Sequence, residues 1–222
     1  SADSPEALEP RLAQSTVMFF DLRGFSKRTE GGTGRILEQI GELRAVMTAM
    51  TEEIFRENGV VLQYQGDGIL ACWNVPIPDD RHVDRAARAA VAMSRRLREV
   101  CPNWRCGIGL HTGEVVAGAI GSEQLFAYSV LGAVVNQASR IEGITKFVET
   151  PILASREVAS KVSPSAAAVV RLGRFRPAGM EEALDLFELA PPPGDLARGL
   201  QLGRGLEAFE AGDWEKAYEL LD

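Results

Sequence analysis

Residues 16 to 30 read TVMFFDLRGFSKRTE, and a single acidic side chain near the middle of this stretch raises the main question about the fold. Thr16 to Phe20 are mostly apolar and favour β-structure, which predicts a buried strand. Asp21 stands where that strand ends, before a turn that contains Gly24. A carboxylate there costs free energy unless a basic side chain, backbone N–H groups or a metal ion pairs with it. The rest of the sequence has to indicate which partner is used.

A second isolated carboxylate, Asp67, lies in the segment QYQGDGIL at residues 63 to 70. It is flanked by Gly66 and Gly68, which predicts a tight turn between two apolar strands. If this hairpin lies beside the first strand, Asp21 and Asp67 converge at one end of the sheet. Two converging carboxylates favour a hard divalent cation such as Mg²⁺, bridging a substrate's phosphates. The alternative is that each aspartate only caps its own turn.

Hydrophobic periodicity predicts the order of the helices and strands. Apolar residues recur at steps of three and four from about residue 35 to 58, which is typical of a helix that Asn58-Gly59 ends. The order predicts the α+β class with a ferredoxin-like βαββαβ core, an antiparallel sheet with helices on one face, plus additional strands. The other expected elements are strands at about 15–20, within 60–74, 104–121 and 125–132, a helix reaching about residue 100, a helix from 133 ended by Gly143, and strands at 150–155, 169–175 and 183–190.

Composition shifts predict four segments. The first is polar and contains proline, and PPPGD marks a clear boundary near the other end. The last is helical with a break at Gly212-Asp213, and it resembles the start of a tetratricopeptide-like repeat. Because the sequence begins with Ser1 rather than methionine, we expect a fragment of a larger signalling protein with an upstream sensor domain. The segments are an N-terminal linker at 1–13, a catalytic domain at 14–190, a Pro-rich linker at 191–195 and a helical segment at 196–222.

The overall composition narrows the class of protein. The chain has 222 residues and a net charge of −7, which argues against a broad nucleic-acid surface, so no nucleic-acid partner is expected. Its three cysteines show no zinc spacing and fit a reduced setting, so we expect a cytoplasmic catalytic domain. No apolar run approaches the roughly 18 residues that cross a membrane. Membrane attachment through another part of a longer protein stays open.

Two further groups of residues indicate anion chemistry. The loop DLRGFS, at residues 21 to 26, can direct backbone N–H groups and the Ser26 hydroxyl at a phosphate, although Gly24 alone is weak support. Asn136 and Arg140 are four residues apart and share one face of a predicted helix. An amide and a guanidinium so placed can stabilise a phosphoryl transition state. The alternative is a solvated asparagine beside an arginine paired with Glu142 or another acid.

Four motifs together carry a family resemblance that covers roughly residues 15 to 190. FFDLRGFS, YQGDGILA, GIGLHTGEVVAGAIGS and LGAVVNQASRIEGIT occur in the order and spacing of the class III nucleotidyl cyclase catalytic domain. The resemblance implies attack of a nucleotide's 3′-hydroxyl on its own α-phosphate, with loss of pyrophosphate. It also implies a head-to-tail homodimer in which each active site draws residues from both subunits.

The resemblance assigns a role to each matching position. Asp21, Asp67 and the carbonyl of Leu22 would hold two divalent cations, Mg²⁺ or Mn²⁺. Asn136 would orient the ribose and Arg140 would stabilise the transition state, both acting in the partner's site. The residues that would cradle the triphosphate are Arg23, Gly24, Phe25 and Ser26.

The sequence departs from the family pattern at the positions that read the base. Adenylyl cyclases usually carry a lysine and an aspartate or threonine there, and guanylyl cyclases a glutamate and a small polar residue; this chain has Gln63 and Ser129. Both side chains can hydrogen-bond to adenine, but a flipped glutamine amide also suits guanine. A basic residue frequent in the family is replaced by Ala178, and Arg176 or Arg105 is the nearest substitute, although a solvated surface charge is the commoner role for either.

The sequence therefore predicts an adenylyl cyclase that converts ATP to 3′,5′-cyclic AMP for intracellular signalling, with weak discrimination against GTP. One alternative is a guanylyl or dual-specificity cyclase. Another is a catalytically weak pseudo-cyclase that acts as a dimerising regulatory module, against which the retention of Asp21, Asp67, Asn136 and Arg140 argues.

Overall fold

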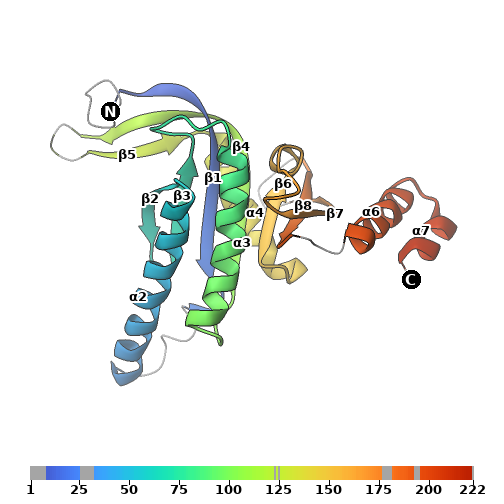
Figure 1. Cartoon of the computed structure of the whole chain (residues 1–222), viewed down its shortest axis with the longest axis horizontal. Helices are drawn as coiled ribbons and strands as arrows, with labels where there is room; N and C mark the ends of the chain where they lie inside the picture. Colours follow the sequence, from blue (N-terminus) through green and yellow to red (C-terminus); the bar gives the residue numbers. More distant parts are fainter. Residues whose placement is uncertain are drawn as a thin grey trace.

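Strand β1 occupies the middle of a mixed sheet in the computed structural model, which describes residues 9–25, 33–122, 124, 126–176, 182–192 and 196–221. The strand order within these residues is β2-β3-β1-β4-β6-β8-β7, and β5 pairs with β4 (Figure 1). The strands are β1 (Arg11–Leu22), β2 (Val60–Gln65), β3 (Gly68–Trp73), β4 (Cys106–Gly121), β5 (Phe126–Leu131), β6 (Ile152–Ser155), β7 (Ala168–Phe175) and β8 (Leu184–Ala190). The helices are α2 (Thr33–Arg56), α3 (His82–Val100), α4 (Ala133–Val148), α5 (Arg156–Ala159), α6 (Leu196–Glu210) and α7 (Trp214–Leu221).

The first half of the chain confirms the predicted core. β1, α2, β2, β3, α3 and β4 follow one another as a βαββαβ unit, with β1 antiparallel to both β3 and β4. The sheet as a whole is mixed, because β6 pairs with β4 in the parallel direction. The α+β class is therefore confirmed, with β5 to β8 as the additional strands.

Alternation along β1 places its side chains in two different cores. Met18 and Phe20 belong to the large core between the sheet and helices α2 and α3. Val17 points to the other face, where it packs with Val134 and Ala138 of α4. The strand is buried on both faces, which explains its nearly continuous apolar sequence.

The predicted arrangement with helices on one face holds for α2 and α3 of the core, but not for the later helix α4. α4 packs on the face opposite α2 and α3, against β4, β1 and β6. Gly109 makes this packing close: a Cβ atom at that position would lie 2.3 Å from the backbone nitrogen of Glu142 and 2.4 Å from the carbonyl oxygen of Ala138. The helix backbone thus lies directly on the strand, at a point where only glycine fits.

Two predicted boundaries are also wrong. β1 begins at Arg11, so residues 11 to 13 belong to the sheet rather than to a linker. α4 continues through Gly143 to Val148 and ends at Glu149, whose φ of 55° is left-handed. Gly143 is a weak terminator here because α4 is held by its buried face, which includes Ile141 and Ile144. The predicted turn from Gln65 to Gly68 and the helix end before Asn58, whose φ is also positive, are confirmed.

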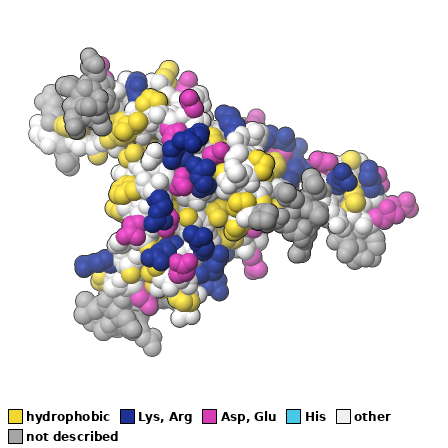
Figure 2. Space-filling model, in the orientation of Figure 1, with side chains coloured by type: hydrophobic (Ala, Val, Ile, Leu, Met, Phe, Trp, Pro, Cys, Tyr) yellow, Lys and Arg dark blue, Asp and Glu magenta, His cyan; other side chains and the backbone are white. Residues whose placement is uncertain are grey.

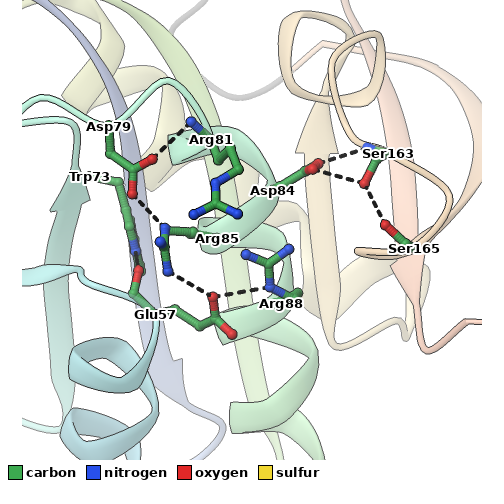
Figure 3. Close-up of polar contacts among 9 residues, drawn as sticks. All are labelled: Glu57, Trp73, Asp79, Arg81, Asp84, Arg85, Arg88, Ser163 and Ser165. Atoms are coloured by element: carbon green, nitrogen blue, oxygen red, sulfur yellow. Dashed lines mark hydrogen bonds and ion pairs between the residues drawn. The ribbon is translucent and has the colours of Figure 1, made fainter.

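Polar contacts secure the start of α3 (Figure 3). Arg85 pairs with Asp79, and Arg88 donates to Glu57, which follows α2, at 3.0 Å. On the opposite side, Asp84 accepts from the backbone N–H and the hydroxyl of Ser163 at 2.7 and 2.8 Å. Basic and acidic side chains are accordingly interleaved on the face drawn in Figure 2 rather than gathered by sign.

The last two helices form the predicted helical segment and break at 211–213. α6 packs against β7, and Arg171 of β7 donates to Glu210 of α6 at 2.8 Å. Phe209 and Trp214 meet edge to face across the break. The likeness to a tetratricopeptide repeat stays a prediction, and residues 193–195 of the predicted linker lie outside the described part of the chain. Among the described helices, none is long and apolar enough to cross a membrane.

Candidate functional site

Asp21 and Asp67 are brought together at one end of the sheet. Asp21 is next to last in β1 and pairs with Gly107 of β4. Asp67 lies in the β2–β3 turn directly before Gly68. A Cβ atom at Gly68 would lie 3.0 Å from the carbonyl oxygen of Phe20 and 3.3 Å from Oδ1 of Asp21. The glycine-flanked turn therefore rests against Asp21, as the sequence predicted.

Both carboxylates have raised pKa values, so both are costly to ionise. Burial, followed by the charge of Asp67, raises the pKa of Asp21 to about 6, against smaller lowering effects of the Leu22 backbone and Lys146. Burial likewise raises the pKa of Asp67. Neighbouring acids with raised pKa values are a frequent mark of a functional site. A bound cation would therefore compensate these two acidic side chains better than the contacts within the chain do.

Glu142 is a third acid at this place, and sequence reasoning missed it. Burial, followed by the charge of Asp21, raises the pKa of Glu142 to about 7, while Arg23 and Lys146 lower it. Its carboxylate lies over Gly107, where a Cβ atom would be 2.3 Å from Oε1. The signal in the sequence is Gly107 itself, since a glycine inside a strand often marks close approach of another element.

The donor set at the end of β1 fits a hard divalent cation. Carboxylate and carbonyl oxygens are the ligands that Mg²⁺ prefers, and Mg²⁺ usually takes only one or two carboxylates besides water and substrate phosphates. No cluster of three or more His, Cys, Asp or Glu side chains suited to a metal occurs in the part of the chain that the structure describes. The metal-binding roles of Asp21, Asp67 and the Leu22 carbonyl stay predictions.

The loop after β1 is described only in part. Gly24 has a φ of 76°, a left-handed value that favours glycine, and Phe25 packs on the ring of Trp104 with centroids 5.4 Å apart. The backbone N–H of Arg23 donates to the carbonyl of Arg105 at 2.8 Å and so is used within the chain. Ser26 lies outside the described residues, and its phosphate role stays a prediction.

Asn136 and Arg140 lie on the exposed side of α4, away from Asp21 of the same chain. Arg140 lines a groove of about 540 Å³ between α4 and the end of β7. Phe147 and Arg176 line the same groove, and Phe147 is 76% exposed. Within the described residues, no hydrogen bond or ion pair joins Asn136 or Arg140 to Asp21 or Asp67.

The structure also shows where Arg176 and Arg105 lie, the two predicted substitutes for the missing basic residue. Arg176 is exposed and shares the groove with Arg140, together with Lys146. Arg105 instead donates to the carbonyls of Pro102 and Trp104, so its contacts are local. Ala178 falls outside the described residues.

The two predicted base-reading residues lie on neighbouring strands. Gln63 is exposed on β2, and its side-chain oxygen accepts from Gln65 at 3.4 Å, a weak contact. Ser129 is half-buried on β5, opposite Gly118 of β4. β2 and β5 contact each other in the fold, but no interaction is described between the two side chains.

The family model described as "Adenylate and Guanylate cyclase catalytic domain" matches residues 9–181 of this chain. The chain belongs to the class III adenylate and guanylate cyclase family. The match includes Asp21, Asp67, Asn136 and Arg140. The family is generally metal-dependent, in agreement with the donor set at the end of β1.

Curated relatives and solved structures agree with this assignment. "Adenylate cyclase 1" of Rhizobium meliloti (strain 1021) is 32% identical over 78% of the chain, which spans 27% of that relative. "Adenylate cyclase" of Anabaena cylindrica is 30% identical over 78% of the chain, which spans 36% of it. The chain thus covers about a third or less of these relatives' lengths.

Among solved structures, the guanylyl cyclase Cya2 is 29% identical with a TM-score of 0.73, covering 84% of this cyclase and 98% of that chain. The adenylyl cyclase CyaB from P. aeruginosa superposes with a TM-score of 0.75 at 20% identity, over 85% of this cyclase and all of that chain. The second likeness shows the fold alone.

Proposed function

We propose that this cyclase converts ATP to 3′,5′-cyclic AMP and pyrophosphate, as a homodimer in an intracellular signalling protein. The observation that carries the proposal is the pair of carboxylates, Asp21 and Asp67, held together at the end of β1 with raised pKa values. These side chains, with the Leu22 carbonyl, would hold two divalent cations, Mg²⁺ or Mn²⁺. When bound, such ions lower the pKa of the attacking hydroxyl and neutralise phosphate charge.

The chain's own residues bind and orient the nucleotide. The reacting hydroxyl and phosphate belong to one molecule, so the protein's tasks are to bend that molecule and stabilise charge. Gly24, Phe25 and Ser26 follow the metal site directly and are the proposed phosphate loop. Asn136 is the proposed ribose ligand, and Arg140 the proposed stabiliser of the transition state.

The placement of α4 supports a shared site. Asn136 and Arg140 are on the exposed side of this helix, whereas Glu142 faces Asp21 of the same chain. A site that combines Asp21 with Asn136 and Arg140 therefore takes the latter two from a second copy. Such an exchange is reciprocal in a symmetric dimer, which then has two sites.

Arg176 supplies a cation for the phosphates in this proposal. It lines the groove with Arg140 and Lys146, and none of the described residues that line this groove is acidic. A nucleotide triphosphate that reaches Arg140 therefore also meets the positive side chains of Lys146 and Arg176, which lie among apolar side chains that include Phe147 and Phe175. The absence of a basic residue at position 178 is thus compensated two residues earlier.

ATP is the proposed substrate, because two curated relatives that match 78% of the chain are named as adenylate cyclases. GTP is the second candidate, favoured by the likeness to the guanylyl cyclase Cya2 and by the neutral Gln63. A glutamine amide can donate to adenine or accept from guanine, which predicts weak discrimination. A regulatory module without turnover is the third candidate.

The first experiment is turnover of ATP and of GTP, separately, with Mg²⁺ and with Mn²⁺, over a range of protein concentrations. Cyclic AMP formation whose specific activity rises with concentration supports both the substrate and the shared site. Cyclic GMP would instead make Gln63 and Ser129 guanine readers. A demonstrated dimer that forms neither product would leave the regulatory module as the function.

The base assignment has its own test. The double variant Gln63→Lys with Ser129→Asp introduces the charged pair typical of adenylyl cyclases. We expect the ratio of kcat/KM for ATP over GTP to rise by about tenfold or more, since a charged hydrogen bond adds roughly 1.4 kcal/mol or more of discrimination. An unchanged ratio with turnover retained would show that the base is read elsewhere.

A further inference from the structure

Arg23 connects the end of β1 to a distant part of the fold. Its backbone N–H donates to the carbonyl of Arg105, just before β4, at 2.8 Å. Its guanidinium nitrogen Nη2 donates to the carbonyl oxygens of Thr145 at 2.8 Å and of Thr150 at 2.7 Å. One residue thus joins the segment after Asp21, the approach to β4 and the carboxyl end of α4.

The guanidinium is well placed for a strong contact at the end of α4. The last carbonyl groups of a helix have no partners within the helix, and they carry the negative end of its dipole. Thr145 is in the last turn, and Thr150 follows the left-handed cap residue Glu149. Both threonines are buried, so the charged hydrogen bonds are little weakened by solvent.

The position of this contact matters for the metal ligands. Pairing between β1 and β4 ends at Leu22 and Cys106, so the sheet itself holds the chain only as far as Leu22. Beyond that point the backbone bond to Arg105 continues the contact by one residue, and the side chain of Arg23 then fixes the segment to α4. Asp21 and the Leu22 carbonyl lie directly before this anchor.

We infer that Arg23 is a positioning residue for the metal site, rather than a phosphate ligand as the sequence predicted. Its guanidinium holds Asp21 and the carbonyl of Leu22 in place by binding the carboxyl end of α4, which is the helix that carries Asn136 and Arg140. The inference rests on the proposed metal-dependent function. In this proposal, Arg23 connects the metal-binding residues of a chain to α4, the helix that the same chain presents to its partner.

If Arg23 only capped α4 and had no role at the metal site, it would make the same hydrogen bonds. In that case, loss of Arg23 would lower the stability of the fold and leave the metal affinity unchanged. A matched control is Arg88, which donates to Glu57 at 3.0 Å in the network of Figure 3 and belongs to none of the proposed site residues. Loss of either arginine is expected to lower the temperature of unfolding.

The test measures Mn²⁺ binding by electron paramagnetic resonance, with α,β-methylene-ATP present so that no turnover occurs. The wild type is compared with Arg23→Gln, Arg23→Lys and Arg88→Gln in the full chain. We expect Arg23→Gln to weaken Mn²⁺ binding by about tenfold or more, the scale seen for residues that orient metal ligands. Arg23→Lys keeps the charge but loses the planar fork, and we expect a loss of about threefold or more. Arg88→Gln should bind Mn²⁺ as the wild type does.

The outcomes separate the inference from the proposed function. Wild-type affinity in a folded Arg23→Gln variant would overturn the inference alone and reduce Arg23 to a helix cap. If that variant does not fold, wild-type affinity in Arg23→Lys would overturn the inference equally. A wild type that binds no Mn²⁺ in the presence of the nucleotide analogue would overturn the proposed metal site, and with it the inference.

Discussion

At the scale of the residue, the main feature of the site is a group of partly buried acidic side chains. Burial, followed by the charge of Asp67, raises the pKa of Asp21 to about 6, and burial, followed by the charge of Asp21, raises the pKa of Glu142 to about 7. The positive charges of Arg23 and Lys146 lower the pKa of Glu142, but they do not outweigh burial and the neighbouring acids. The folded chain therefore maintains a repulsion that a divalent cation relieves, which is the physical reason to expect metal dependence at this place.

Asp21→Asn tests the central assignment. We expect turnover to fall by about a hundredfold or more, a loss typical of removing one electrostatic stabiliser of a transition state. Without added metal, the unfolding temperature should stay the same or rise, because one member of a repelling pair is gone. Asp80→Asn changes an exposed aspartate outside the site and is the matched control, to be measured by the same product assay and thermal melt. Retention of most activity in Asp21→Asn would refute the metal-ligand role.

The raised pKa of Glu142 predicts how stability depends on pH. Its value rises from 4.5 to about 7 on folding, so between these limits the folded chain binds more protons than the unfolded chain. The free energy of unfolding contributed by this group therefore falls as the pH rises from about 4.5 to about 7. His82 and His111, whose pKa values burial lowers, act in the opposite direction.

Comparison with Glu142→Gln isolates this contribution. We expect the variant to gain stability relative to the wild type when both are moved from pH 5 to pH 8 in a chelator. Urea unfolding at the two pH values measures the difference. An identical change in both proteins would show that Glu142 is not held in a costly environment.

At the scale of the element, α4 has two functional sides. Its inner side packs on β4 and brings Glu142 near Asp21, while its exposed side presents Asn136, Arg140 and Lys146. The close approach depends on Gly107 and Gly109, whose missing side chains leave room for the helix. Small changes in how α4 sits on the strand therefore affect both sides at once.

Gly109→Ala should displace α4. The added methyl group would lie 2.3 Å from a backbone atom of the helix, which cannot rotate away, so we expect a loss of about 2 kcal/mol or more in the free energy of unfolding. Gly41→Ala, in α2, meets nothing within 4 Å and should instead stabilise the chain by roughly 0.5–1 kcal/mol. Urea denaturation of both variants gives the comparison. Equal effects would mean that α4 is less tightly seated than its contacts indicate.

Elements whose sequence signals lie within a few neighbouring residues could be predicted from the sequence. The β2–β3 turn and the βαββαβ core follow from glycine placement and periodicity, and the pairing of Asp21 with Asp67 follows from the strand order. The side of the sheet that α4 covers could not be predicted from the sequence, because α4 is amphipathic whichever face it packs on. Glu142 and the contact of Arg23 with Thr145 were missed because they join positions more than a hundred residues apart.

At the scale of the whole molecule, each chain of the proposed dimer contributes to two different active sites. The metal-binding half lies at the end of β1, and the half with Asn136 and Arg140 lies on the outer side of α4, beside the groove that Arg176 lines. α6, packed on β7, extends the same chain beyond the end of the catalytic domain. Only a second copy brings complementary halves together in the proposed arrangement.

Complementation between two inactive variants tests this arrangement. Asp21→Asn and Arg140→Ala should each be inactive alone, since every site in either homodimer lacks one half. Mixed in equal amounts and allowed to exchange, half of the dimers contain one chain of each kind, and one of their two sites is intact, so about a quarter of wild-type activity should return. Asp21→Asn mixed with Asp67→Asn is the control and should stay inactive, because both variants damage the same half. If the first mixture also stays inactive while exchange is demonstrated by labelled chains, Asn136 and Arg140 do not act in the partner's site.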